Sequence, residues 1–384
     1  MYDQIIAANK SFIDETWAKL ERKLARVAVK SRDKIPYTTF DGVHDDRSGE
    51  QINWWTNGFW GGLMWLMYIG TKNEEFKITA EKAEKMMDAA LANIPRLHHD
   101  VGFMWHIMSG VNYRLTGNPE SRNRNLIAAM TLASRFNISG KYIRCWNGKW
   151  RGMDNESWTI IDCMMNIPLL YWASEELGDK RFEKIALAHA DMSMVQHVRP
   201  DGSVNHIVAH DLETGELVET YAGQGYAVGS TWSRGAAWAL YGFILSYIHT
   251  KKPEYLDTAK KVAHYFITNL IADDWLPIVD FRAPEEPKRY DSTAGAIAAC
   301  GLIEIAKNVP ENEQKIYLNA AINVLSAMEK KFCNWEENED SVLQMGTELY
   351  HSVNGKGDHI PIIYGDYFFT EAILKLRGEQ FLPW

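Results

Sequence analysis

Two kinds of helical segment alternate along the chain, and this alternation most restricts the folds that it can adopt. Segments of one kind are poor in charge and apolar on nearly every side, whereas those of the other are charged and amphipathic. A helix that is apolar all round must be buried, and an amphipathic helix can cover it. The apolar segments are 57–70, 101–117, 157–178, 230–249, 291–306 and 365–376, and the amphipathic ones are roughly 2–27, 74–93, 119–136, 179–197, 253–272 and 311–331.

The connections between these segments are of two lengths. Each change from an apolar to a charged segment passes through a short turn, as in LTGNPES and ELGDKRF, whereas the reverse change passes through a long irregular stretch. Six inner and six outer helices joined in this way predict an all-α fold, an (α/α)6 barrel of six helical hairpins, with residues 1–384 as one domain. A linear solenoid of helix pairs is the alternative, but solenoids usually repeat with a more constant period.

Polar groups mixed with aromatic residues or glycine stand at the starts of all six apolar segments. In a closed barrel these starts converge on one rim, where long loops on a rigid scaffold usually carry function and helix N-termini favour an anionic ligand. The stretches are WWTNGFW, HHDVGF, NESWTIIDCMMN, TWSRGAAW, RYDSTAG and IIYGDYF. Residues 201–227 break the helical pattern, and their LETGEL turn between alternating segments predicts a small β-hairpin near this active-site rim.

Composition narrows the class of protein. A net charge of −9 argues against a nucleic-acid or anionic-membrane partner and leaves a small-molecule substrate. The 15 Trp and 17 Tyr residues suit a sugar-binding cleft as well as a core. The four cysteines form no CxxC pair, and the N-terminus does not read as a signal peptide, so we expect a cytoplasmic protein. Nothing in the sequence indicates an oligomeric state.

Asp100 and Asp162 are the leading catalytic candidates. They stand at the starts of successive inner segments and should therefore be neighbours. Asp100 is equally well placed to cap a helix, with His99 orienting its carboxylate or touching the sugar. Asp162 lies within the apolar stretch TIIDCMMNIPLL, where a lone carboxylate is unfavourable without a partner or a task. Burial and a nearby like charge favour the protonated form of such a group, which is the form that a general acid needs.

The predicted hairpin carries two further candidates. His206 and His210 share a face of a strand or a helix, but no glutamate stands at HExxH spacing and no third ligand is signalled. We therefore expect no metal and assign both histidines to hydrogen bonding with a substrate, with a plain polar loop as the alternative. Gln224 lies between two glycines, which allow a ligand to approach the backbone closely.

Aromatic side chains and one arginine complete the candidate site. Arg234 in WSRGAAW either pairs with a carboxylate of the protein or is offered to one of the substrate. For the tryptophans the sequence favours a sugar-binding platform and an ordinary core position equally. The other binding candidates are Trp54, Trp55, Asn57, Trp146, Trp232, Ser233 and Trp238.

In this order the motifs resemble those of the unsaturated glucuronyl hydrolases of glycoside hydrolase family 88. The resemblance covers roughly residues 50–376 and rests on WWTNGFWGGLMWL, HHDVGFMW, IIDCMMNIPLLYWAS, GQGYAVGSTWSRGAAWALYGF, DSTAGAIAACGLIEI and IIYGDYFFTEAI. It implies an (α/α)6 barrel, no metal or organic cofactor, and an unusual reaction. Such enzymes release the 4,5-unsaturated uronic acid from the non-reducing end of lyase-generated oligosaccharides by hydrating its C4=C5 bond.

The resemblance also implies residue roles. Asp162 falls on the general acid/base and Asp100 on the second essential aspartate. The positions that line the family's pocket are His206, Gln224, Trp54 or Trp55, Trp146, Trp232, Arg234 and Trp238. One departure is Ala236, where the family motif usually has Gln after WSRG, and this puts in doubt a polar contact from that position.

Three other functions fit parts of the pattern. An unsaturated rhamnogalacturonyl hydrolase shares the barrel and the hydration chemistry but acts on pectin fragments. A sugar epimerase or isomerase on the same barrel would depend on paired histidine bases, and a non-catalytic barrel would bind sugar without consuming the double bond.

Overall fold

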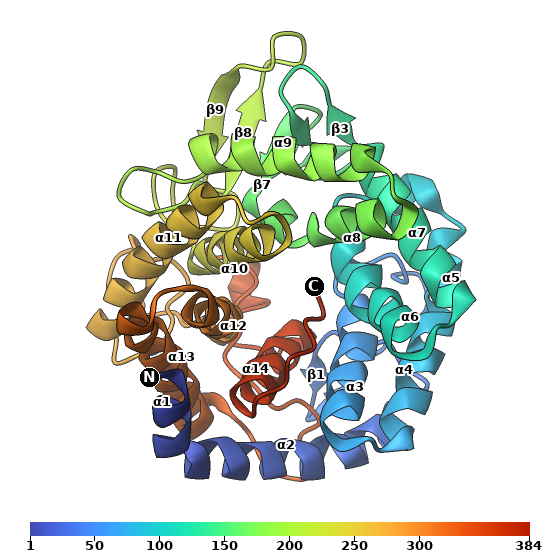
Figure 1. The fold of residues 1–384 in the computed structure, drawn as a ribbon, viewed down its shortest axis with the longest axis vertical. Helices are drawn as coiled ribbons and strands as arrows, with labels where there is room; N and C mark the ends of the chain where they lie inside the picture. The colour runs from blue at the N-terminus through green and yellow to red at the C-terminus, as the bar shows by residue number, and fades with distance from the viewer.

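The computed structural model describes residues 1–384 and shows two concentric rings of helices (Figure 1). Helix α14 packs against α3 and closes the inner ring, so the (α/α)6 barrel is confirmed and the solenoid is not. The inner ring consists of α3 (Gly58–Thr71), the π-helix η2 (Gly102–Gly110) with α6 (Val111–Thr116), α8 (Pro168–Leu177), α10 (Ser233–Thr250), α12 (Ser292–Asn308) and α14 (Ile363–Leu376).

The outer ring covers the inner one. It consists of α2 (Lys10–Lys30), α4 (Glu74–Met86), α7 (Pro119–Ala133), α9 (Lys180–Gln196), α11 (Pro253–Ala272) and α13 (Glu311–Phe332), with short α1 (Tyr2–Ala8) and α5 (Asp88–Leu91) beside it. Five hairpins are continuous in the chain. The sixth pairs α14 with α2, so elements from the two ends of the sequence complete the barrel.

The turns at one end of the barrel are short for a physical reason. The residue after α3, α6, α8 and α10 adopts the left-handed conformation at Lys72, Gly117, Gly178 and Lys251, which ends each helix and reverses the chain. A second turn residue then leads directly into the outer helix. The long connections all lie at the other end, as expected, and form the rim.

The core is continuous around the barrel. One cluster of buried apolar residues extends from Ile13 to Trp384, and α12 is buried on every face from Ser292 to Ala306. The C-terminus, at Trp384, lies inside the ring (Figure 1). The Trp384 indole stacks on the ring of Phe368. We therefore propose that residues 1–384 form one domain.

Short strands supplement the helices. Antiparallel pairs join β1 (Thr39–Phe40) to β2 (Val43–His44), β3 (Phe136–Asn137) to β4 (Tyr142–Ile143) and β5 (Lys149–Trp150) to β6 (Met153–Asp154). The predicted hairpin is confirmed as β8 (Ile207–His210) and β9 (Leu217–Tyr221). It continues into a three-stranded sheet, because β7 (Trp158–Ile160) pairs with β8 with Ile160 opposite Ile207.

The prediction of one continuous helix over 157–178 was wrong. The stretch begins as β7, passes through a 3-10 turn η3 (Ile161–Met165) and becomes helical only at Pro168. Trp, Thr and Ile favour strands, and proline favours the first position of a helix, so local preference divides this apolar run. The result places Asp162 in a turn.

Two smaller helical turns, η1 (Ile94–Arg96) and η4 (Val353–Gly355), lie in the rim loops. The helices of the structure are too short or too polar to cross a lipid bilayer.

Candidate active site

A cavity of about 560 Å³ opens at the rim, between the loops that precede the inner helices. A volume in this range accommodates a ligand the size of a drug molecule. The side chains that line it are Tyr37, Asn53, Trp54, Trp55, Pro95, Arg96, His98, Trp146, Asn147, Trp150, Arg151, Gln224, Arg234, Glu348, Leu349 and Tyr364. Four of the six predicted helix starts contribute to the lining, through Trp54 and Trp55, His98, Arg234 and Tyr364, whereas Asp100 and Asp162 are not among the lining residues.

Asp100 lies directly before the π-helix, and two imidazoles and one amide surround its carboxylate. His98 Nδ1 lies 3.2 Å and His99 Nε2 3.3 Å from its Oδ2 atom, while Asn166 Nδ2 donates to Oδ1 at 3.3 Å. Burial alone raises the pKa of Asp100, but the charge of His99 and the hydrogen bonds from both histidines outweigh it. The pKa of this carboxyl therefore lies well below its usual value, and Asp100 is a fixed negative charge.

Asp162 has a contrasting environment. It is 6% exposed, and its Oδ1 atom has no hydrogen-bond partner although His206 Nε2 lies 3.4 Å away. The Gln224 backbone N–H donates to His206 Nδ1 at 3.0 Å, so in the neutral ring the hydrogen is on Nε2, which faces Asp162. Gly223 makes this approach possible, since a Cβ there would lie 2.0 Å from His206 Nδ1.

Asn166 connects the two aspartates. Its fully buried amide donates to Asp100 Oδ1 and, at 3.3 Å, to the backbone oxygen of Asp162. Its own Oδ1 accepts the Phe103 N–H at 2.9 Å. A Cβ on Gly102 would lie 2.6 Å from that oxygen, so glycine after the HHDV stretch is required for this contact.

Aromatic rings form much of the cavity wall. The Trp146 and Trp150 rings stack with centroids 5.7 Å apart, and the Trp146 ring lies 6.5 Å from that of His206. Trp55 lies against Tyr364 at 5.2 Å. Trp54 is 40% exposed, so its face is free for a ligand. Flat amphipathic rings in this arrangement suit the faces of sugar rings.

Arg234 lines the cavity, but its charge is already paired. Its guanidinium bonds to the Asp291 carboxylate and donates to the backbone oxygens of Thr347 and Glu348, both at 2.7 Å. It also lies over the Trp232 ring at 4.5 Å. Of the two alternatives left by the sequence, the structure therefore shows the pairing with the protein, and Arg234 fixes the 347–348 loop against the wall.

Some predicted binding residues lie outside the cavity. Asn57, Ser233 and Trp238 are fully buried, as is His99. Asn57 donates to the backbone oxygens of Gln51 and Ile52, and Ser233 donates to that of Val279. A side chain without exposed surface cannot contact a sugar, so these residues act at most through their neighbours, as His99 does through Asp100.

The expectation that His210 joins His206 in binding is corrected. His210 Nε2 contacts Gln196 Oε1 at 2.6 Å, and its ring stacks on Tyr142 with centroids 4.1 Å apart. A strand rises about 3.3 Å per residue, so two histidines four residues apart lie far from one another even on a shared face.

Several residues at the site were not assigned from the sequence. His98 was recognisable, because it stands in the same HHD stretch as Asp100. Asn166 and Glu348 carry no comparable local signal, since their roles depend on loops that meet only in the folded chain. The Tyr37 hydroxyl donates to Glu348, which joins the loop before α3 to the loop before α14.

One group at the site has metal-binding geometry. The possible ligand atoms of His98, His99 and Asp100 all lie within 4.8 Å of one another. The same atoms are accounted for as imidazole-to-carboxylate contacts, so the expectation that the site needs no metal stays a prediction.

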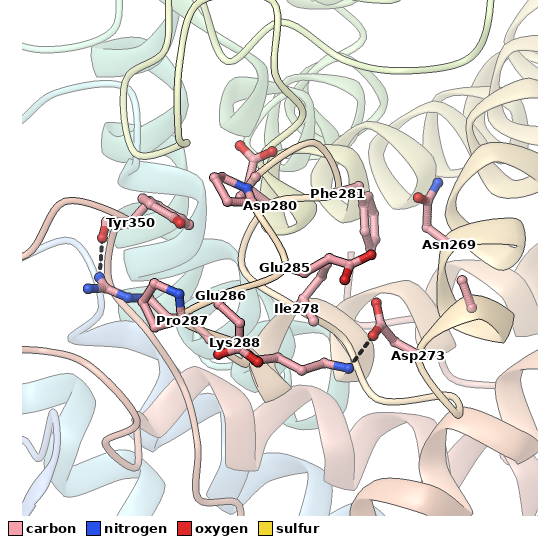
Figure 2. A pocket seen from close by; sticks show the side chains of 14 residues that line it. Asn269, Asp273, Ile278, Asp280, Phe281, Glu285, Glu286, Pro287, Lys288 and Tyr350 are labelled. Carbon is pink, nitrogen blue, oxygen red and sulfur yellow. Dashed lines mark hydrogen bonds and ion pairs between the residues drawn. The ribbon is translucent and has the colours of Figure 1, made fainter.

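A second cavity of about 520 Å³ lies between the end of α11 at residues 269–273 and the loop 278–289, with Tyr350 at its edge (Figure 2). Its two cationic side chains are bonded within the protein. Lys288 bonds to Asp273, and Arg289 donates to the backbone oxygen of Tyr350 (Figure 2). The cavity bounded by His98 and Gln224 is the better candidate for the active site. His98 contacts Asp100, and the Gln224 backbone bonds to His206, which faces Asp162.

Comparison with known proteins agrees with this geometry. No protein-family model matches the chain. The sequence is 33% identical over 358 residues to the unsaturated glucuronyl hydrolase of Bacillus sp. (strain GL1), covering 92% of this chain and 93% of that protein. It is 36% identical over 332 residues to the unsaturated chondroitin disaccharide hydrolase of Streptococcus pyogenes serotype M1, covering 85% and 82%. The crystal structure of the Bacillus sp. GL1 enzyme, described as responsible for the degradation of glycosaminoglycan, superposes with a TM-score of 0.86 at 31% identity over 94% of this chain and 97% of that one.

Proposed function

The chain belongs to the unsaturated glucuronyl hydrolases, and on that basis we propose that it removes the 4,5-unsaturated uronic acid from the non-reducing end of lyase-generated glycosaminoglycan oligosaccharides. The observation that carries the proposal is the pair of buried aspartates in different surroundings. Asp100 is held as an anion beside two imidazoles and the Asn166 amide, while Asp162 Oδ1 has no hydrogen-bond partner and faces one imidazole. A carboxyl free to exchange a proton beside a fixed carboxylate is what acid-catalysed hydration of a double bond needs.

The reaction begins with proton transfer from the Asp162 carboxyl to C4 of the unsaturated ring. The C4=C5 electron pair forms the new C4–H bond, and the positive charge left at C5 is shared with the ring oxygen. The Asp162 carboxylate then takes a proton from a water molecule, and the oxygen of that water bonds to C5. One residue thus serves as acid and as base, and it returns to its starting state.

The sugar completes the reaction by rearrangement. The hemiketal at C5 opens to a ketone as its hydroxyl proton passes to the ring oxygen. C1 then bears a hydroxyl and the leaving sugar, and this hemiacetal collapses to an aldehyde and a free alcohol. One water is consumed overall. Because the anomeric carbon is never attacked, the separation of the two carboxylates does not report retention or inversion.

The neighbouring residues have supporting roles in this proposal. Asp100 accepts hydrogen bonds from sugar hydroxyls. Asn166 keeps Asp100 and Asp162 in place, and His206 presents its Nε2–H beside Asp162. Trp54, Trp55 and Trp146 provide faces for the sugar rings, and the Gln224 amide, bonded to the Glu348 oxygen at 2.7 Å, borders the same space.

We also propose that the protein acts in the cytoplasm. Its four cysteines are all unpaired, and Cys145, Cys163 and Cys300 are buried. Thiols kept apart in this way fit a reducing compartment.

The test is to incubate the protein with unsaturated disaccharides derived from chondroitin, hyaluronan, heparin and pectin and to follow the ultraviolet absorbance of the double bond. We expect the absorbance to fall with the glycosaminoglycan fragments and the reducing sugar to appear in equal amount. Binding without loss of absorbance would support a non-catalytic barrel, and consumption of the pectin fragment alone would support the rhamnogalacturonyl alternative.

A further inference from the structure

Two arginines in the cavity lining have no role in the proposed reaction. Arg96 and Arg151 are exposed, and neither guanidinium has a carboxylate partner or an oxygen acceptor. Other arginines of this region are used to build the protein. Arg135 donates to Asn147 Oδ1 at 2.9 Å and to the backbone oxygens of Cys145 and Trp146, and Arg144 donates to Asn155.

Asn147 brings the loops that carry these two arginines together. Its amide donates to the backbone oxygens of Pro95, at 3.2 Å, and Leu97, at 2.8 Å, the residues on either side of Arg96. The loop with Arg96 is thus attached to the loop that continues to Arg151, and Arg135 fixes Asn147 from behind. Hydrogen bonds within the protein therefore hold the two loops that carry Arg96 and Arg151.

The backbone at Arg151 gives an independent indication. Arg151 and Gly152 connect β5 to β6 and have φ angles of 49° and 83°. A two-residue hairpin turn with both φ angles positive favours Asn or Asp followed by Gly, and a side chain such as Arg is unfavourable at its first position. Such a conformation persists only where the surrounding structure holds it in place. The Arg151 guanidinium lies over the Trp150 ring at 4.7 Å, which directs it along the cavity wall.

The position in the cavity indicates which part of a substrate these charges meet. The reacting ring must reach buried Asp162, whereas Arg96 and Arg151 lie on exposed loops. Resting on the function proposed above, we infer that Arg96 and Arg151 form an outer subsite that binds an anionic substituent, a sulfate ester or a carboxylate, on a sugar beyond the bond that is broken. Guanidinium groups suit both anions, because they offer paired donors.

The experiment compares kcat/KM for three substrates. These are an unsaturated uronyl–hexosamine disaccharide without sulfate, the same disaccharide with one sulfate ester, and an unsaturated tetrasaccharide with a carboxylate on its third sugar. We expect Arg96→Gln and Arg151→Asn each to lower the ratio of kcat/KM for an anionic over the unsulfated substrate about fivefold, and the double variant more. Raising the salt concentration should reduce the wild-type ratio, because exposed charges are screened.

Arg151→Asn separates binding from structure. Asparagine relieves the turn, so the melting temperature should rise or stay constant while the ratio falls. Arg22→Gln removes the same charge from the exposed face of α2 and should leave the ratio unchanged. A fall with the sulfated disaccharide alone identifies sulfate as the ligand, and a fall with the tetrasaccharide alone identifies the carboxylate.

Ratios within twofold of the wild type for both anionic substrates in the double variant would overturn the inference. Failure of the wild-type protein to consume any of the three substrates would instead refute the proposed function, so the two failures are distinguishable.

Discussion

Several carboxylates are buried in the barrel, and one pair near each end differs from the other in how its charges are partnered. At the rim, two imidazoles and the Asn166 amide surround the Asp100 carboxylate, whereas Asp162 Oδ1 has no hydrogen bond and faces only the His206 imidazole. At the opposite end, both carboxylates contact the buried Lys375: Glu304 of α12 and Glu371 of α14. Glu371 also accepts from the Tyr241 hydroxyl and, at 3.1 Å, from the Trp384 indole.

The two ends differ in whether the buried carboxylates have all the donors and cations that they need. Burial raises the pKa of Glu371, whereas Lys375 and Lys307 outweigh burial at Glu304 and lower its pKa. A buried ion pair with all its donors supplied stabilises one conformation and has no capacity left for a ligand. A buried acceptor without a partner is unfavourable in the empty protein and becomes useful when a substrate arrives. The rim is therefore built for chemistry and the opposite end for stability.

Removing the incomplete group should have the largest effect. Asp162→Asn keeps the shape of the side chain but cannot donate or accept the proton, so we expect kcat to fall on the order of 10³-fold with little change in melting temperature. Asp366→Asn is the matched control. Burial raises the pKa of Asp366 to about 7, and its oxygens accept only from the backbone of Val342 and Leu343, so kcat should be retained. Residual turnover above a tenth of the wild-type rate in Asp162→Asn would exclude it as the acid.

Removing the central charge of the opposite end should act on stability alone. Lys375→Met leaves Glu304 and Glu371 buried without their cation, and we expect the free energy of unfolding to fall by about 3–5 kcal/mol. Urea denaturation measures this, and kcat per folded molecule should be unchanged. Lys307→Met removes a more exposed partner of Glu304 and should lower the stability by less than about 1 kcal/mol. Equal losses in both variants would contradict the central role of Lys375.

Two buried asparagines allow the same contrast at smaller scale. Asn166 donates to Asp100 at the rim, and Asn112 of α6 donates to Glu84 Oε2 at 2.6 Å near the other end. Asn166→Leu should lower kcat about tenfold to 100-fold and change its pH profile, because Asp100 loses a donor. Asn112→Leu should lower the melting temperature without lowering kcat. If the two variants differ only in stability, Asn166 has no part in positioning the aspartates.

The smallest effect concerns a histidine near the rim that has no carboxylate partner. Burial lowers the pKa of His197 to about 3, although the Asn205 backbone oxygen, 2.9 Å from Nδ1, opposes this. The folded state then binds fewer protons than the unfolded state, so the stability due to neutral His197 is present above about pH 6.5 and is lost as the pH falls toward 3. Between pH 6.5 and 5.5 we expect a loss of about 1 kcal/mol that His197→Gln does not show. The urea midpoints of the wild type and of His197→Gln at the two pH values measure this loss. The same change of midpoint with pH in both proteins would disprove the assignment.

Much of the fold was predictable because it follows from short-range patterns. The ranges 253–272 and 311–331 were predicted closely, since each combines an amphipathic period with a proline at or near its start and a charged first turn. The run 157–178 was not, because its apolar residues fit a buried strand as well as a buried helix. Only the pairing of Trp158 with Ala209, distant in the sequence, selects the strand.

The candidate site divides in the same way. Asp100, Asp162, Trp54, Trp55 and Trp146 were proposed from the sequence, because polar groups inside apolar runs and aromatic clusters are visible locally. Trp232 and Trp238 were proposed too but are not among the residues that line the cavity. The sequence by itself determined the alternating helices, and hence the barrel and its rim. Only the tertiary structure decided which groups at that rim are satisfied: it paired Arg234 with Asp291, removed His210 to the Gln196 contact and left Asp162 Oδ1 without a partner. The physical reason is that hydrogen bonding and burial are set by neighbours from remote parts of the chain, whereas helical periodicity is set by residues three and four positions apart.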